Sequence, residues 1–221
     1  MRINQYLARA GLASRRTADT LIAAGRVTVN GQKVTLGVKV EESDLVTLDG
    51  KTVTLPSSAI TYLLYKPKGV VSTTSDPEGR PTVLDYVPKG VRLYPIGRLD
   101  FQSEGLILIT SDGDLANKLT HPRYEVEKMY RVLIRGHLSP QDRGRIEKGV
   151  KLSDGLTAPA KVENIQEEGG NMWLDITVTE GRNHLIKRLF EHFEHTVLRL
   201  IRLKMGDYEL GDLRPGQYKK L

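Results

Sequence analysis

Residues 97–113, GRLDFQSEGLILITSDG, join a charged loop to a strongly apolar segment. The loop places Arg98, Asp100 and Glu104 between two glycines, and Gly105 to Thr110 is almost entirely apolar. A short apolar run bounded by turn residues predicts a buried strand, and polar functional groups are often held on the loop beside such a scaffold. The Arg and Asp also fit a turn-forming ion pair without a catalytic role. The stretch therefore predicts a buried strand and a candidate site.

The rest of residues 60–221 is dominated by strand patterns with three helical interruptions. Strand patterns occur at 62–65, 130–134 and 162–179. Helices are predicted after Ser111 or Asp112, after Ser139-Pro140, and from Gly181 to Phe193. Long strands with few crossover helices predict an α+β fold with a mixed, largely antiparallel sheet.

The first fifty residues read as a separate small α/β domain. Apolar residues recur at helical spacing from Ile3 to Ala10, and Ser14 is a candidate N-cap for a second helix. The pattern then alternates around Asn30-Gly31, a strong β-hairpin signal. Residues 51–59 are poor in apolar side chains and rich in Thr, Ser and Pro. We therefore predict a small domain over 1–50, a linker over 51–59 and a larger domain over 60–221.

The charge of the chain favours a polyanionic partner. There are 33 Lys and Arg residues against 27 Asp and Glu residues, a net charge of +6. Arg15 and Arg16 fall in the first turn of the predicted second helix, where the helix dipole disfavours cations. An RNA phosphate backbone is one source of counter-charge for this pair, and a solvated helix face is the alternative reading.

Several classes of protein are excluded. The chain contains no cysteine, no apolar run of the roughly 18 residues that a membrane span needs, and no signal-like opening segment, so we expect a cytoplasmic protein. Nucleotide-binding P-loop, serine-hydrolase and zinc-protease motifs do not occur. The five histidines do not stand at zinc-ligand spacing with a suitable acid, so no metal site is predicted.

A second charged cluster, EGRNHLIKRLF, occupies residues 180–190. On a helical wheel Ile186, Leu189 and Phe190 form the buried stripe, and Lys187 lies at its flank. A flanking lysine either extends to solvent or reaches a neighbouring cleft and pairs with a carboxylate. Tyr130, in EKMYRV at 127–132, is either a core tyrosine with its hydroxyl at the surface or part of a site.

The motifs described above resemble two known protein families. Residues 2–34, RINQYLARAGLASRRTADTLIAAGRVTVNGQKV, resemble the start of the S-four-type RNA-binding domain, and the resemblance extends to about residue 50. The motifs GRLDFQSEGLILITSDG, EKMYRV and EGRNHLIKRLF, in that order behind this domain, closely resemble the bacterial ribosomal pseudouridine synthases of the RsuA type. The likeness runs over nearly the whole chain and includes LLYKPKGV, DPEGRPTV and TAPAK. One departure is Leu185, where the wider superfamily often has Gln.

The RsuA-type resemblance implies conversion of a uridine in RNA to pseudouridine, without cofactor or metal. It implies that Asp100 is the essential carboxylate, that Lys187 is its basic partner, and that Tyr130 stacks on the uracil. Arg98 is expected to steady the RNA once the target base has left the helical stack, and Leu200 to pack on the base. Whether the carboxylate attacks the anomeric carbon or removes a ribose proton stays open.

The expected partner is structured ribosomal RNA, a stem-loop that is either free or part of a pre-ribosomal particle, and we expect a monomer. ARAGLASRR, DPEGRPTV and EGRNH resemble the large-subunit branch of the family more closely. Two alternatives remain: the same chemistry on small-subunit RNA, and a ribosomal RNA-binding assembly factor without catalytic activity. The sequence does not reveal the target nucleotide, because RNA recognition depends on loop shape and splayed bases.

Overall fold

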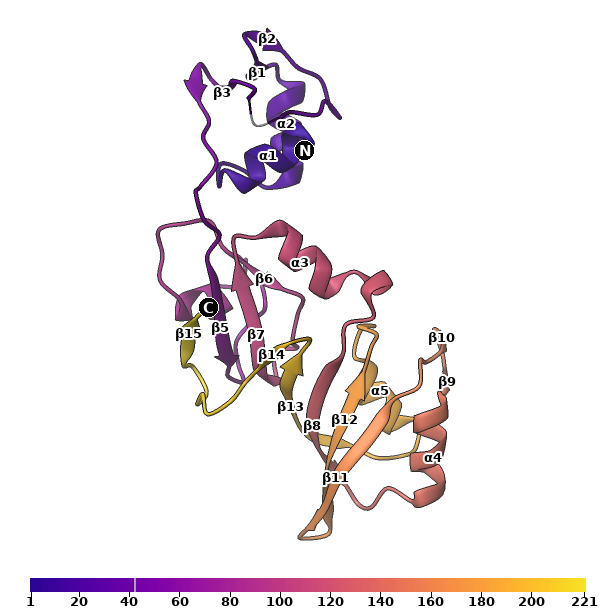
Figure 1. Cartoon of the computed structure of the whole chain (residues 1–221). Helices are drawn as coiled ribbons and strands as arrows, with labels where there is room; N and C mark the ends of the chain where they lie inside the picture. Colours follow the sequence, from indigo (N-terminus) through magenta and orange to yellow (C-terminus); the bar gives the residue numbers. More distant parts are fainter. Residues whose placement is uncertain (42) are drawn as a thin grey trace. The chain divides into compact units, whose positions relative to one another are not determined.

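The computed structural model describes residues 1–41 and 43–221 (Figure 1). The chain divides into two compact units. The smaller comprises residues 1–60 with the short segments 89–93 and 111–113, and the larger comprises 61–88, 94–110 and 114–221. Each unit has its own hydrophobic core.

The smaller unit combines two helices, α1 (Ile3–Arg9) and α2 (Arg15–Ala23), with a four-stranded antiparallel sheet. Its strands are β1 (Val27–Val29), β2 (Gln32–Lys33), β3 (Val46–Leu48) and β4 (Lys51–Thr52), in the order β2-β1-β3-β4. Ser14 caps α2, since its hydroxyl accepts the backbone N–H of Thr17 at 3.0 Å. Asn30 and Gly31 have φ values of 51° and 80°, which suit the tight β1–β2 hairpin. Two helices and a hairpin occur where the sequence predicts them.

The first residues of the predicted linker, 51–53, still belong to the smaller unit. Lys51–Thr52 pair with β3, and the side chain of Val53 is buried in the small core. The hydroxyl of Tyr6 donates to the carbonyl of Val53 at 3.1 Å. Pairing with β3, which the local composition does not reveal, makes this short polar segment a strand.

The larger unit is built on a nine-stranded sheet with the order β11-β12-β8-β13-β7-β5-β15, flanked by β14 beside β13 and β6 beside β7. The strands are β5 (Thr61–Lys66), β6 (Tyr94–Ile96), β7 (Glu104–Thr110), β8 (Lys128–Arg135), β11 (Lys161–Glu168), β12 (Asn171–Val178), β13 (Val197–Met205), β14 (Tyr208–Glu209) and β15 (Tyr218–Lys220). Among the described strands of this sheet, β13 and β7 pair in parallel and the other pairs are antiparallel. The predicted α+β fold with a largely antiparallel sheet is confirmed.

Helices α4 (Pro140–Lys148) and α5 (Leu185–Glu191) pack against the half of the sheet that contains β8, β11, β12 and β13 (Figure 1). Ile146 of α4 and Leu189 and Phe190 of α5 are buried in that core. The remaining elements are α3 (Gly113–Thr120), the 3₁₀ turns η1 (Val83–Tyr86) and η2 (Pro122–Tyr124), and the hairpin β9 (Lys151–Leu152) and β10 (Gly155–Leu156). No helix in the described part of the chain is both long and apolar enough to span a bilayer.

Two predicted elements have different limits in the structure. The strand pattern over 162–179 forms two antiparallel strands, β11 and β12, because Gly169 and Gly170 take positive φ and reverse the chain. The helix predicted from Gly181 to Phe193 covers Leu185 to Glu191. His184 stands directly before it with φ 51° and ψ 26°, a left-handed conformation that cannot continue a right-handed helix.

The parallel junction of β7 and β13 depends on Gly105. This glycine lies opposite Arg202 in the register and has φ 106°. A Cβ atom at position 105 would lie 2.5 Å from the backbone nitrogen of Arg202, far inside van der Waals contact. Glycine therefore lets the two backbones approach here, and this approach fixes the start of β7 directly after the loop that carries Asp100.

Candidate active site

Asp100 lies in the loop between β6 and β7, and hydrogen bonds anchor its neighbours. Ser72 accepts the backbone N–H of Leu99 at 3.1 Å and donates its own hydroxyl to the Leu99 carbonyl at 2.8 Å. The carbonyl of Phe101 accepts the N–H of Gly69 at 2.8 Å. Both residues next to Asp100 are thus fixed to the segment that follows β5, which gives the carboxylate a defined origin.

Two basic side chains face the two oxygens of Asp100. The Nζ atom of Lys187, on α5, lies 2.7 Å from Oδ2, and the Nε2 atom of His184 lies 3.2 Å from Oδ1. The lysine contact is a charge-assisted hydrogen bond. Among the described ion pairs none joins Arg98 to Asp100, so the turn-forming ion pair considered from the sequence does not form. Of the two positions considered for the Lys187 side chain, the structure shows the one in which its ammonium pairs with a carboxylate.

Five of the seven predicted site residues line one cavity of about 170 Å³: Arg98, Asp100, Tyr130, Lys187 and Leu200. Tyr130 comes from β8 and Leu200 from the adjacent strand β13. Arg15 and Arg16 belong to the other unit, where they are exposed in the first turn of α2 with no acidic residue in that turn. The fold therefore brings the loop, two strands and a helix together around Asp100.

Two buried cations at this cavity are not predicted by any pattern in the sequence. Arg202 and Lys128 both line it, and both are buried. Arg202 donates Nε–H to the carbonyl of Leu106 at 2.7 Å, and Lys128 donates to the carbonyl of Val126 at 2.7 Å. Burial, followed by the charge of Arg202, lowers the pKa of Lys128. Carbonyl groups rather than carboxylates hold these side chains, so the cavity has a positive lining.

Lys66, the last residue of β5, is fully buried. Its ammonium donates to the carbonyls of Ser103 at 2.7 Å and Pro67 at 3.0 Å. Burial lowers the pKa of Lys66 to about 8, while the negative charges of Asp100 and Glu104 oppose this shift. The sequence feature at Lys66 is the Lys-Pro-Lys-Gly turn in LLYKPKGV. This turn predicts the end of a strand but does not predict a buried cation.

Glu104, the first residue of β7, is a buried acid, and its surroundings give it a structural role. It accepts two hydrogen bonds from Arg199, at 2.7 and 3.1 Å, and one from the hydroxyl of Tyr65 at 3.4 Å. Burial raises the pKa of Glu104, but the bonds and charge of Arg199 outweigh it, so the net shift is downward. Glu104 is thus a paired anion that ties β7 to β13.

The described residues contain no group of three or more His, Asp or Glu side chains arranged to hold a metal ion. The arrangement around Asp100 is suited to acid–base or nucleophilic chemistry by a carboxylate that has a cation within hydrogen-bonding distance. The aromatic and aliphatic side chains of Tyr130 and Leu200 add an apolar surface for a flat ring in the same cavity.

Two protein families match this chain. The RNA pseudouridylate synthase family matches residues 60–192, and the S4 domain family matches residues 1–46. The chain is 42% identical to an "Uncharacterized RNA pseudouridine synthase" of Aquifex aeolicus over 100% of this chain and 90% of that protein. It is 40% identical to "Ribosomal large subunit pseudouridine synthase B" of Bacillus subtilis, over 100% of this chain and 91% of that protein.

A solved structure titled "Crystal structure of pseudouridylate synthase" has the same fold. It covers 100% of this chain and 96% of its own, with a TM-score of 0.71 and 29% identity. The family match includes the Asp100 loop, Tyr130 and Lys187, which the structure places around one cavity. The chain belongs to the RNA pseudouridylate synthase family and carries an N-terminal S4 domain.

Proposed function

We propose that this protein isomerises a uridine of ribosomal RNA to pseudouridine, with Asp100 as the essential carboxylate. The observation that carries the proposal is the Asp100 carboxylate in a cavity beside Tyr130, with the Lys187 ammonium 2.7 Å away. Membership of the pseudouridylate synthase family supplies the reaction that this arrangement serves. Relatives named ribosomal large subunit pseudouridine synthase B favour the large-subunit RNA as substrate.

The reaction rearranges atoms of the substrate without net gain or loss. The bond between N1 of uracil and C1′ of ribose breaks, the uracil turns, and C5 forms the new bond to C1′. The proton on C5 leaves and N1 acquires a proton. Asp100 either attacks C1′ as a nucleophile or removes the proton on C2′, and both routes require a negatively charged carboxylate. The Nζ atom of Lys187 lies within hydrogen-bonding distance of that carboxylate, at 2.7 Å from Oδ2.

The cavity must receive a base that has left the helical stack, because a stacked uridine cannot present its sugar carbon to Asp100. We assign Tyr130 to stacking on the uracil and Leu200 to packing against it, since both line the cavity. Arg98 is exposed at the same cavity, and we assign it to steadying the RNA after the base has flipped. The unstacking costs a few kcal/mol, which contacts of the flipped base offset.

We assign RNA capture to residues 1–50 and catalysis to residues 60–221. Exposed Arg15 and Arg16 on α2 would contact phosphates of a stem-loop, and the S4 match supports an RNA-binding role for this unit. We expect a cytoplasmic monomer that acts on free ribosomal RNA or on a pre-ribosomal particle.

Tritium release tests the reaction. Ribosomal RNA labelled with tritium at C5 of uridine should release label with the wild-type protein, and Asp100→Ala and Asp100→Asn should release none. RNA affinity should change little in both variants, because Asp100 acts on the bond rather than on the backbone. Equal release by either variant would contradict the role of Asp100.

The same assay separates the alternatives. Each ribosomal RNA is tested alone and in a partly assembled particle, and release from large-subunit RNA alone is the expected result. Release from small-subunit RNA alone would move the substrate to that RNA. Tight binding without release in any form of either RNA would favour an assembly factor without catalytic activity.

A further inference from the structure

We infer that His184 is a positioning residue that holds the Asp100 carboxylate in its reactive orientation. The inference rests on the proposed isomerisation. The Nε2 atom of His184 lies 3.2 Å from Oδ1 of Asp100, on the oxygen that Lys187 leaves free. His184 also lines two cavities that contain Asp100, and its side chain is 53% exposed.

The backbone of His184 is held in an unfavourable conformation. Its φ of 51° and ψ of 26° fall in the left-handed region, which costs a non-glycine residue free energy. His184 precedes α5, yet its side chain makes no capping hydrogen bond to that helix. The strain is therefore not offset by a cap. The side-chain contact that accompanies it is the one with Asp100, and strain of this kind is a feature of functional sites.

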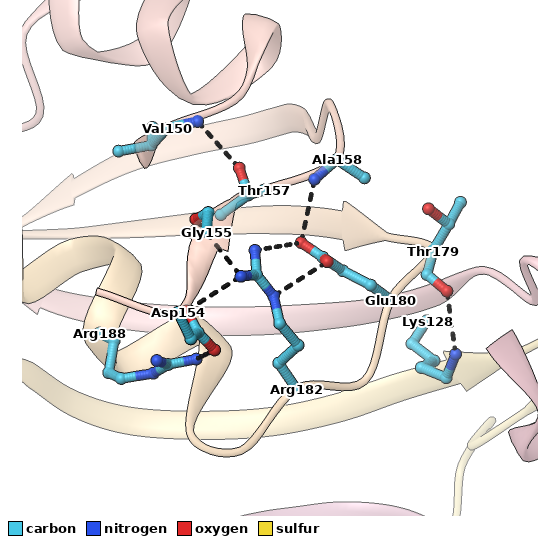
Figure 2. A network of polar contacts seen from close by, with 10 residues as sticks. All are labelled: Lys128, Val150, Asp154, Gly155, Thr157, Ala158, Thr179, Glu180, Arg182 and Arg188. Atoms are coloured by element: carbon cyan, nitrogen blue, oxygen red, sulfur yellow. Dashed lines mark hydrogen bonds and ion pairs between the residues drawn. The ribbon is translucent and has the colours of Figure 1, made fainter. Parts of the chain in front are cut away.

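A network of ion pairs holds the strained turn from both sides (Figure 2). Before His184, Arg182 donates to Asp154 at 2.9 Å and to Glu180 at 3.2 Å. After it, Arg188 of α5 donates to the other oxygen of Asp154 at 2.8 Å. Asp154 thus bridges two arginines that flank His184 in sequence.

The network is also tied to the rest of the unit. Glu180 accepts the backbone N–H of Ala158 at 3.0 Å, and Asp154 belongs to the turn of the β9–β10 hairpin (Figure 2). The hydrogen bond from Arg188, followed by the charges of Arg182 and Arg188, lowers the pKa of Asp154, so this bridge is anionic. A clamp of this kind over-determines the backbone between residues 180 and 188, which is what a strained residue needs in order to persist.

Two contacts restrict Asp100 more than one does. The χ2 torsion of aspartate has a broad energy minimum, so the Lys187 contact at Oδ2 alone leaves the carboxylate plane free to rotate. A second contact at Oδ1 fixes that plane. Each oxygen has two lone pairs, so both contacts leave one on each oxygen for the reaction. His184 therefore orients the carboxylate and leaves a lone pair on each of its oxygens available for the reaction.

Removal of the imidazole tests the inference. In His184→Gly the left-handed backbone is allowed and the Asp100 contact is lost. The single-turnover rate at saturating enzyme should fall about 10-fold or more, because misplaced reacting groups lose rate steeply. RNA affinity should stay at the wild-type value and Tm should be equal or higher. Free imidazole should restore part of the lost rate, since the position is exposed to solvent.

Glu125→Gly is the matched control. Glu125 is an exposed residue with φ 45° and ψ 37°, and it lies outside the two cavities given above for His184. Its replacement relieves the same kind of backbone strain, so Tm should respond as in His184→Gly. The single-turnover rate should remain at the wild-type value, and imidazole should have no effect on it.

The outcomes are separable. A loss of rate that imidazole restores, with unchanged RNA affinity, supports the positioning role. A wild-type rate in His184→Gly would overturn it, and so would a loss that imidazole fails to restore. If wild-type protein releases no tritium from any RNA, the proposed isomerisation itself fails, and that result does not depend on the variant.

Discussion

The ammonium of Lys187 lies 2.7 Å from Oδ2 of Asp100, although 87 residues separate them in sequence. Helix α5 supplies the cation and the loop before β7 supplies the acid. The loop enters β7 where Gly105 lets that strand approach β13, so the geometry of the pair depends on the sheet junction as well as on the two side chains.

Lys187→Met should lower the single-turnover rate about 100-fold, the loss that follows removal of one preorganised donor from an active site. Lys187→Arg keeps the charge but not the length or shape of the side chain, so its rate should lie between those of Lys187→Met and wild type. Tritium release under single-turnover conditions measures both. Equal rates for Lys187→Met and Lys187→Arg would show that the positive charge beside Asp100 is not what matters.

Replacing Arg15 and Arg16 together with Gln should weaken RNA binding and flatten its salt dependence. Each lost phosphate contact reduces the slope of log K against log salt by about 1, so the double variant should lose about 2. The helix dipole disfavours cations at the start of α2, so Tm should stay equal or rise. Filter binding from low to high salt gives the slope, and an unchanged slope would mean that these arginines do not contact phosphate.

Local signals in the sequence predicted most of the individual elements. Ser14 and Ser139 cap helices where the sequence places them, because an N-cap acts on an amide only three residues away. The Asn30-Gly31 hairpin follows equally from the conformations that these residues allow. The apolar run after Gly105 became a fully buried strand. Each of these features depends on residues close together in the chain.

The site depends on contacts that no local pattern contains. The apolar spacing from 181 to 193 predicts one helix, and Asp154, one of the two acids that pair with Arg182 before α5, comes from the distant β9–β10 hairpin. Lys66 reads as the end of a strand, and its burial arises from the packing of the sheet around it. The Asp100–Lys187 pair has no periodic spacing either. The family resemblance, not the periodicity, assigned them to one site.

Gly105→Ala should destabilise the larger unit by about 1–3 kcal/mol, the usual cost of forcing extra volume into a packed site. The added Cβ would meet the backbone of Arg202, and the positive φ of residue 105 adds strain. Urea denaturation measures the change. Gly144→Ala is the control: residue 144 lies inside α4 with open space around it, so this variant should gain about 0.5–1 kcal/mol. A neutral Gly105→Ala would contradict the close approach of β7 and β13.

The buried ammonium of Lys66 should make stability depend on pH in alkaline solution. Its pKa falls from the ordinary 10.5 to about 8 in the folded protein, because burial disfavours the cation. Between these values the unfolded chain binds a proton that the folded protein has released. The free energy of unfolding contributed by this residue therefore rises with pH through that window. Below about pH 8 both states hold the proton and the contribution is flat.

Lys66→Met removes this titration, so the unfolding free energy of wild type minus that of Lys66→Met should increase from about pH 8 to about pH 10.5. Urea denaturation at a series of pH values measures the difference, in which groups common to both proteins cancel. Lys118→Met replaces an exposed lysine of α3 and should track the wild-type curve. A difference that is constant or falls across the alkaline window would contradict burial of a cation at this position.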